Sequence, residues 1–219
     1  TLSSSSAASD VYKRQSQARH PGLKLGHEHD PGSGEVEALV FGFWIFMMSD
    51  LLIFGCVFAT YVVMLPQVAD GPSAAELFHL RGPLIETTLL LASSVTIGFA
   101  LLETKHRADK RRTTLWLAVT FLLGAGFLFS STHSLLGHLE NGAGPSRSAF
   151  LSAYWLLVPL HALHVAIGCL WIAVAAAQVW IRGFDWVTTG GLLRLSIYWH
   201  FLDIVWIGIL SVVYLGAMI

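Results

Sequence analysis

Two pairs of ionisable side chains interrupt the apolar C-terminal half of the sequence. His161 and His164 are three residues apart in VPLHALHVAIG, and His200 and Asp203 are three apart in WHFLD. Residues at positions i and i+3 of a helix share one face. Imidazole can ligate a metal, and a His–carboxylate pair can form a proton relay or the outer shell of a metal site. The spacing therefore makes both pairs candidate site residues.

Haem ligation by these histidines has a geometric requirement. Two axial ligands must approach the porphyrin from opposite sides, which adjacent turns of one helix cannot do. A second ligand would have to come from another helix at matching depth. The only other clear candidate is His200, which we predict nearer the cytoplasmic end of its segment. Hydrogen-bonded histidines at a helix interface are therefore the favoured prediction.

Two acidic residues also fall within apolar segments. Asp50, in FGFWIFMMSDLLIFG, is expected near the middle of the bilayer, where a carboxyl group must be protonated, paired or facing a polar cavity. A structural hydrogen bond and a functional role both remain open for it. Glu86 opens the next segment and is expected near the membrane surface. Ser93 continues its helix face, and Ser94 begins to turn away from it.

The segments that must position these residues are apolar enough to cross a membrane. Hydrophobic residues make up 54% of the chain and charged residues only 12%, whereas about a quarter of the residues in a soluble domain are charged. The sequence therefore predicts an all-α integral membrane bundle. Five segments meet the length of about 20 residues that a spanning helix needs: 39–65, 84–103, 114–138, 149–181 and 195–218.

Small residues recur at helical spacing in these segments. Gly55 with Ala59, Ser94 with Gly98, and the GAG run at 124–126 would let helix backbones approach closely, which predicts a packed bundle. Cys56 and Cys169 both lie in apolar runs and are expected to be small buried residues. The net charge of −1 offers no basic patch for nucleic acid.

The basic residues predict the orientation of the spans. The connection ETKHRADKRR (103–112) carries five Lys and Arg residues, whereas the connections on either side of it carry one each. Because cytoplasmic loops are enriched in Lys and Arg, this connection is predicted to be cytoplasmic, with the N-terminus inside and the C-terminus in the periplasm. A second cytoplasmic loop, with Arg182 and Arg194, is expected before the fifth span.

The N-terminal region separates from the spans by composition. DVYKRQ resembles a translated sequencing-adapter end, so residues 1–15 are predicted to be non-native. Residues 16–38 are polar, contain Pro and Gly, and are predicted to form a disordered cytoplasmic tail. Residues 39–219 are predicted to form the five-helix transmembrane domain.

Several stretches together resemble a known family. The chain is similar to subunit III of the haem–copper terminal oxidases, in the short five-helix form of bo-type ubiquinol oxidases. The most specific stretches are H-x-L-H-V-x-x-G and W-H-F-x-D-x-V-W. The resemblance covers about 41–218 and rests on FGFWIFMMSD, ETTLLLASSVTIG, NGAGPSRSAFLSAYW, HALHVAIG and WHFLDIVWIGILSVVYLGAM.

The resemblance implies a non-catalytic subunit of a bacterial inner-membrane oxidase that takes part in aerobic respiratory electron transport and proton translocation. Such a subunit holds no haem or copper itself. It packs against subunit I, which carries both, in a complex with subunits II and IV. It also encloses phospholipid in a V-shaped cleft between the first two helices and the remaining three. On this basis the structural and lipid-cleft residues are Asp50, Glu86, His161, His164, His200 and Asp203, with His200 and Asp203 as a pair that fixes helix register.

One departure from the family pattern concerns the third span. Relatives carry two glutamates three residues apart where this sequence has Ser131 and Ser134. Any role that depends on those acids is therefore not expected here.

The sequence leaves three alternative functions open. The oxidase could take electrons from cytochrome c rather than quinol. A haem-b-binding membrane anchor would use His161, His164 and His200. A small proton-coupled carrier would use Asp50 and Glu86.

Overall fold

The computed structural model describes residues 33–69, 77, 80–106 and 109–218. The chain divides into two units, Thr1–Phe41 and Gly42–Ile219. The first unit is described only from Ser33, where helix α2 (Ser33–Met64) begins. The predicted non-native residues and most of the predicted tail thus lie outside the described residues, and residues 33–38 are helical rather than disordered.

The described residues include five helices long and apolar enough to cross a membrane, as predicted. They are α2 (Ser33–Met64), α4 (Arg81–His106), α5 (Lys110–Glu140), α6 (Ala149–Arg182) and α7 (Trp186–Ile209). A π-helical segment, η1 (Leu210–Leu215), continues α7 and is followed by the 3₁₀ turn η2 (Gly216–Met218). The described residues contain no β-strand.

Helix α7 begins at Trp186, well before the predicted start of the fifth span at 195. Asp185 is extended, and its carboxylate accepts a hydrogen bond from the Thr188 hydroxyl at 2.6 Å. The first turns contain Thr, Gly and Arg194, so their hydropathy is low although they are helical. Arg194 is consequently part of the helix, and His200 lies near the middle of the span Trp186–Leu215 rather than near one end.

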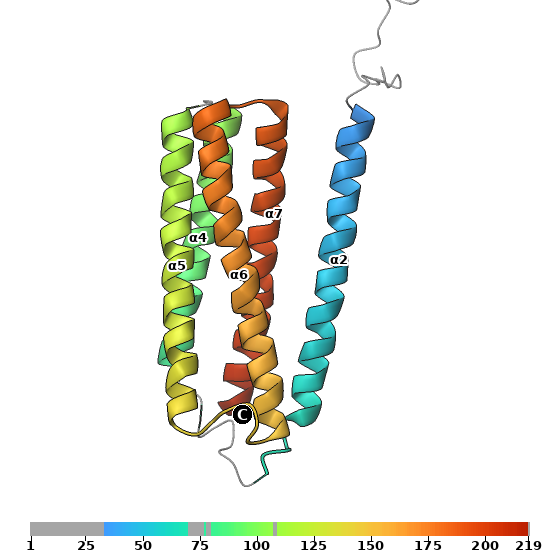
Figure 1. The fold of residues 1–219 in the computed structure, drawn as a ribbon, viewed down its shortest axis with the longest axis vertical. Coiled ribbons are helices and arrows are strands. Elements are labelled where there is room, and N and C mark those ends of the chain that lie inside the picture. Colours follow the sequence, from blue (N-terminus) through green and yellow to red (C-terminus); the bar gives the residue numbers. More distant parts are fainter. Residues whose placement is uncertain (1–32, 70–76, 78–79, 107–108, 219) are drawn as a thin grey trace, which may run out of the picture. The chain divides into compact units, whose positions relative to one another are not determined.

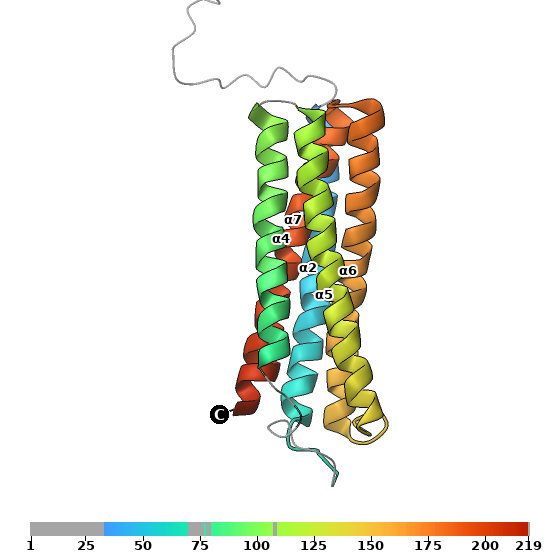
Figure 2. The ribbon, with the colours of Figure 1, turned by 90° about the vertical axis from the view of Figure 1, so that its left-hand side faces the viewer.

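Four helices form a closely packed bundle. Backbone contacts join α4 to α5, α5 to α6, α6 to α7 and α7 back to α4, so the four helices lie side by side in a ring (Figures 1 and 2). The interior is filled by large buried side chains, above all Trp199, Trp206, Tyr154 and Phe127.

This arrangement corrects the predicted cleft. We expected the first two helices to stand apart from the other three, but the second, α4, packs directly on α5 and α7. The physical reason is visible in its contacts, because hydroxyl groups of α4 bond to α5 and α7 along its length. Among the five described spanning helices, α2 is the one that lacks such close backbone packing from Gly42 onward.

Helix α2 instead reaches its neighbours through long side chains. Phe43 packs edge-on against Trp171 of α6, and Tyr61 packs against Phe150 of the same helix. Met47, Asp50, Phe54 and Tyr61 are the buried residues of this face. Their spacing of three, four and seven residues keeps them on one side of the helix.

Candidate functional site

Asp50 and His164 form a polar contact between α2 and α6. The Asp50 Oδ1 atom lies 3.1 Å from His164 Nε2. His164 Nδ1 is 2.8 Å from the Leu160 carbonyl oxygen, which can only accept, so Nδ1 carries a hydrogen. Nε2 can then bond to Asp50 only if one further proton lies between the two groups. The pair therefore shares a proton, either as neutral carboxyl and imidazole or as carboxylate and imidazolium.

His161 lies one turn before His164 but has entirely different surroundings. Its ring is fully buried, stacked on Trp206 with ring centres 5.4 Å apart and edge-on to Phe54 and Phe127. Neither ring nitrogen has a hydrogen-bond partner among the described residues, and the same holds for Asp50 Oδ2. His161 is thus enclosed by aromatic side chains.

Trp199 of α7 fills the centre of the four-helix bundle. Its Nε1 donates to the Ser93 hydroxyl of α4 at 2.8 Å. Its ring lies so close to Gly124 of α5 and Gly168 of α6 that an added Cβ would come within 2.8 Å and 2.9 Å of ring carbons. Three helices therefore meet at one side chain, and two of them can do so only because they present glycine.

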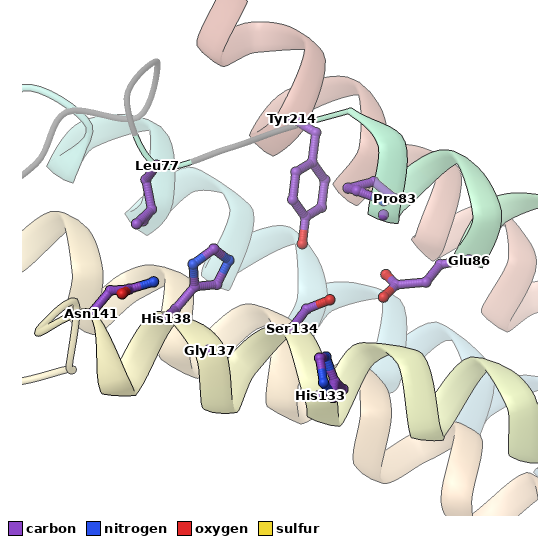
Figure 3. A pocket seen from close by; sticks show the side chains of 10 residues that line it. Leu77, Pro83, Glu86, His133, Ser134, Gly137, His138, Asn141 and Tyr214 are labelled. Atoms are coloured by element: carbon purple, nitrogen blue, oxygen red, sulfur yellow. The ribbon is translucent and has the colours of Figure 1, made fainter.

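Glu86 is buried near the start of α4, and it borders a cavity. Its Oε1 accepts a hydrogen bond from Ser130 of α5 at 3.0 Å. Beside it is an open cavity of about 280 Å³ near the ends of α4, α5 and η1. Figure 3 shows the Glu86 carboxyl group on one side of this space and the Tyr214 ring beside it. On the other side lie His133, Ser134 and His138 of α5 and Asn141, which directly follows that helix. Ser134, at one of the two positions where the family resemblance led us to expect acids, thus lines the cavity, whereas Ser131 is buried.

His200 and Asp203 do not bond to each other, contrary to the predicted pair. His200 Nδ1 lies 2.5 Å from the Ser94 hydroxyl of α4. Neither carboxyl oxygen of Asp203 has a hydrogen-bond partner among the described residues. The Ser94 hydroxyl also lies close to the Asp203 carboxyl group. However, the hydrogen-bond geometry of this hydroxyl is satisfied with His200 Nδ1 and not with Asp203. The interhelical contact therefore joins His200 to α4.

The six predicted residues occupy three separate places. Asp50, His161 and His164 lie together, Glu86 lies at the cavity, and His200 with Asp203 lies on the α4–α7 side. Among the described residues, no group of three or more His, Cys, Asp or Glu side chains is arranged to hold a metal. Haem ligation would also have to displace existing contacts, because both nitrogens of His164 are engaged and His161 is enclosed by rings. The arrangement is suited to holding helices together.

Several residues that form hydrogen bonds between helices were not predicted from the sequence. The buried indoles of Trp199 and Trp206 donate to Ser93 and Thr87, respectively, on α4. Tyr198 donates to the His164 backbone carbonyl at 3.0 Å, which links α7 to the helix of the histidine pair. An indole or phenol group in the middle of a spanning segment is a usable signal, because such a group needs a hydrogen-bond partner when it is buried.

Comparison with known proteins gives a consistent result. The model of the family described as "Cytochrome c oxidase subunit III" matches residues 27–218. The chain is 45% identical over 196 residues to the cytochrome bo(3) ubiquinol oxidase subunit 3 of Pseudomonas aeruginosa, covering 89% of this chain and 93% of the relative.

Further relatives extend this similarity. The subunit of the same name from Pseudomonas putida is 41% identical over 85% of this chain and 88% of its own length. The cytochrome c oxidase subunit 3 of Bacillus sp. (strain PS3) is 36% identical over 91% of this chain and 99% of its own length. With five spanning helices of this length and a family match across nearly all of them, the chain belongs to the cytochrome c oxidase subunit III family.

Proposed function

We propose that this chain is the non-catalytic subunit 3 of a bo-type ubiquinol oxidase in aerobic respiration. The observation that carries the proposal is the 45% identity to the Pseudomonas aeruginosa bo(3) subunit over 89% of the chain. In such a complex the chain would stabilise subunit I, which would carry the haem and copper, and would associate with subunits II and IV. The complex would reduce oxygen and translocate protons.

The internal contacts support a structural role. Asp50 with His164, Glu86 with Ser130, and His200 with Ser94 each join two different helices. Polar contacts between helices contribute about 0.6 kcal/mol each on average in a membrane protein. Several of them, together with close packing around Trp199, would keep the subunit rigid while it docks on a larger partner.

Phospholipid binding is part of the same proposal, at a corrected place. The cleft between two helices and three is not formed, so we assign a lipid headgroup to the Glu86 cavity. Its volume of about 280 Å³ suits a small zwitterionic headgroup. The Glu86 carboxyl group would attract an ammonium group, and His133 and Asn141 would bond to phosphate oxygens.

We further propose a bacterial inner-membrane location with the N-terminus in the cytoplasm. Lys110, Arg111 and Arg112 lie at the start of α5, at the end of the bundle where α4 ends. Basic residues at a membrane end favour the cytoplasmic side. The Glu86 cavity would then lie at the periplasmic end.

A second candidate differs only in electron donor. Relatives at 36% identity include a cytochrome c oxidase subunit 3 from Bacillus sp. (strain PS3) that covers 91% of the chain. A subunit III of a cytochrome c oxidase therefore remains the alternative, and the partner subunits would decide between the two.

The test is a mild-detergent purification of the tagged chain from its native membrane, read by mass spectrometry and a reduced-minus-oxidised spectrum. We expect a large haem-bearing partner and oxygen consumption with ubiquinol but not with reduced cytochrome c. The chain expressed alone should have no Soret band. Haem retained by the lone chain would contradict the proposal, and oxidation of cytochrome c would favour the second candidate.

A further inference from the structure

His200 is an exposed imidazole at the middle of a membrane-spanning segment. It lies near the centre of the span Trp186–Leu215, and its partner Ser94 lies near the centre of Arg81–Thr104. The hydrocarbon interior of a bilayer offers no hydrogen-bond partner at that depth. Ionisable residues inside a membrane normally face a protein interior or a water-filled cavity. An exposed one therefore indicates a surface that is covered by something other than lipid.

The hydrogen bonds of the ring identify the atom that needs a partner. Nδ1 bonds to Ser94, whereas Nε2 makes no hydrogen bond to any residue that the structure describes. In a neutral imidazole one nitrogen is a donor and the other an acceptor. Whichever tautomer is present, Nε2 presents either a hydrogen or a lone pair that hydrocarbon would leave unsatisfied.

The surface around this atom is otherwise apolar. On α7, Leu193, Ile204 and Ile207 are exposed and lie seven residues before, four after and seven after His200, so they share its face. On α4, Leu91 is exposed three residues before Ser94. Asp203 cannot serve as the external contact, because both of its carboxyl oxygens are buried. His200 Nε2 is therefore a polar atom that an external partner can reach, and the exposed side chains nearest to it on this face are apolar.

We infer that the His200 face, made of Leu91, Ser94, Leu193, His200, Ile204 and Ile207, docks one transmembrane helix of another oxidase subunit. That helix supplies a hydrogen-bonding side chain to His200 Nε2 at mid-membrane. The inference rests on the proposed function, and it adds the surface and the contact atom. An apolar helix with one polar residue fits this pattern, because polar side chains stabilise helix contacts in lipid.

Two other occupants fit less well. A phospholipid headgroup stays at the membrane surface and cannot reach the middle of the bilayer. A second copy of this chain would place one His200 against another across a two-fold axis, where identical tautomers present two donors or two acceptors to each other. A different chain has no such restriction.

The first test compares three variants of His200 in the complex extracted with mild detergent from native membranes. His200→Asn retains a polar atom near the Nδ1 position and loses the outward one, His200→Gln reaches the Nε2 position, and His200→Leu loses both. We expect the haem-bearing partner retained per tagged chain to fall about 3- to 20-fold for Asn and Leu and little for Gln. The thermal stability of the isolated chain reports the Ser94 contact separately, and Asn should preserve it.

The second test places the photoreactive residue p-benzoylphenylalanine at Ile204. We expect a cross-link to another subunit under conditions in which the same residue at Leu122 of α5, which has similar exposure, gives a different product or none. A cross-link from 204 to lipid or to a second copy would overturn the inference. So would wild-type partner retention in the Asn and Leu variants. Failure of the wild-type chain to capture any haem-bearing partner would instead count against the proposed function itself.

Discussion

Helix α2 and the α4–α7 bundle are held in place by different kinds of contact. In the bundle, glycines at 124 and 168 bring two backbones against the Trp199 ring. From Gly42 onward, α2 packs no backbone closely on a neighbouring helix. Its Phe58 ring lies against Gly208 of α7, and it contacts α6 through Asp50, Phe54 and other long side chains. The hydrophobic effect does not drive helices together in lipid. The association of α4–α7 therefore depends on close packing, whereas the association of α2 with α6 depends on a few side-chain contacts.

This difference explains where polar residues matter most. In the bundle, loss of one hydrogen bond leaves a large packed surface intact. Among the described residues, the Asp50–His164 contact is the polar side-chain link between α2 and α6, and neither the ring nitrogens of the nearby His161 nor Asp50 Oδ2 have hydrogen-bond partners there. Removal of that one contact should therefore weaken a whole interface.

The largest expected effect comes from filling the glycine contact in the bundle. Gly168→Leu would drive a side chain into Trp199, which already lies 2.9 Å from an added Cβ. Overpacking of this kind costs about 3 kcal/mol. Thermal unfolding of the detergent-solubilised chain should show a large loss of stability.

The matched control for that variant is Gly98→Leu on α4. An added Cβ there meets nothing within 4 Å, so we expect stability close to wild type. Equal destabilisation by both substitutions would show that helix packing around Trp199 is not the dominant constraint.

The next effect concerns the α2 contact. Asp50→Leu leaves His164 Nε2 without its partner, and an unsatisfied buried polar group costs about 1–3 kcal/mol. Asp50→Asn should cost much less, because the amide can donate to a neutral imidazole. Thermal unfolding of the single variants and of Asp50→Leu with His164→Leu forms a double-mutant cycle. Strict additivity in that cycle would mean that the two residues do not act as a pair.

A smaller effect on stability is expected from Glu86→Gln, a variant that tests whether this polar group of the bundle binds a ligand. Glu86→Gln keeps the hydrogen-bond acceptor for Ser130 but removes the charge at the cavity. We expect little change in unfolding temperature and about a 5-fold loss in retained phosphatidylethanolamine, measured by native mass spectrometry. Glu103→Gln, on the same helix outside the cavity, should retain the lipid. Unchanged retention in Glu86→Gln would remove the cavity as a headgroup site.

The smallest effect is expected outside the membrane, at the start of α7. The hydrogen bond from Thr188 lowers the pKa of the exposed Asp185 carboxyl group from its usual range. A lowered folded-state pKa stabilises the protein above the unfolded pKa, and this contribution is lost as the pH falls through the folded value. Thr188→Val should therefore reduce stability slightly at pH 7, and the difference from wild type should shrink below about pH 4. A difference that grows on acidification would contradict this assignment.

Much of the architecture follows from the order of residues along the chain. The five spans, the all-α class and the family resemblance were predicted correctly, because apolar length and the WHFLD and HALHV stretches are local properties of sequence. The predicted close contacts at small residues are confirmed only in part. Gly124 does make a close approach, whereas Gly55 and Gly98 face open space. Spacing shows that a small residue is available on a helix but not which side its neighbour occupies.

The partners of the polar residues could be decided only by the tertiary structure. Sequence spacing paired His200 with Asp203, but the rotation of α4 against α7 brings Ser94 to His200 instead. It likewise gave no partner for Glu86, which accepts a hydrogen bond from Ser130 of α5. The sequence by itself determined that these groups lie in spanning helices and need partners, because an unsatisfied polar group is costly in lipid. Which partner each one finds depends on the rotation and depth of neighbouring helices, and those are set by packing around side chains such as Trp199.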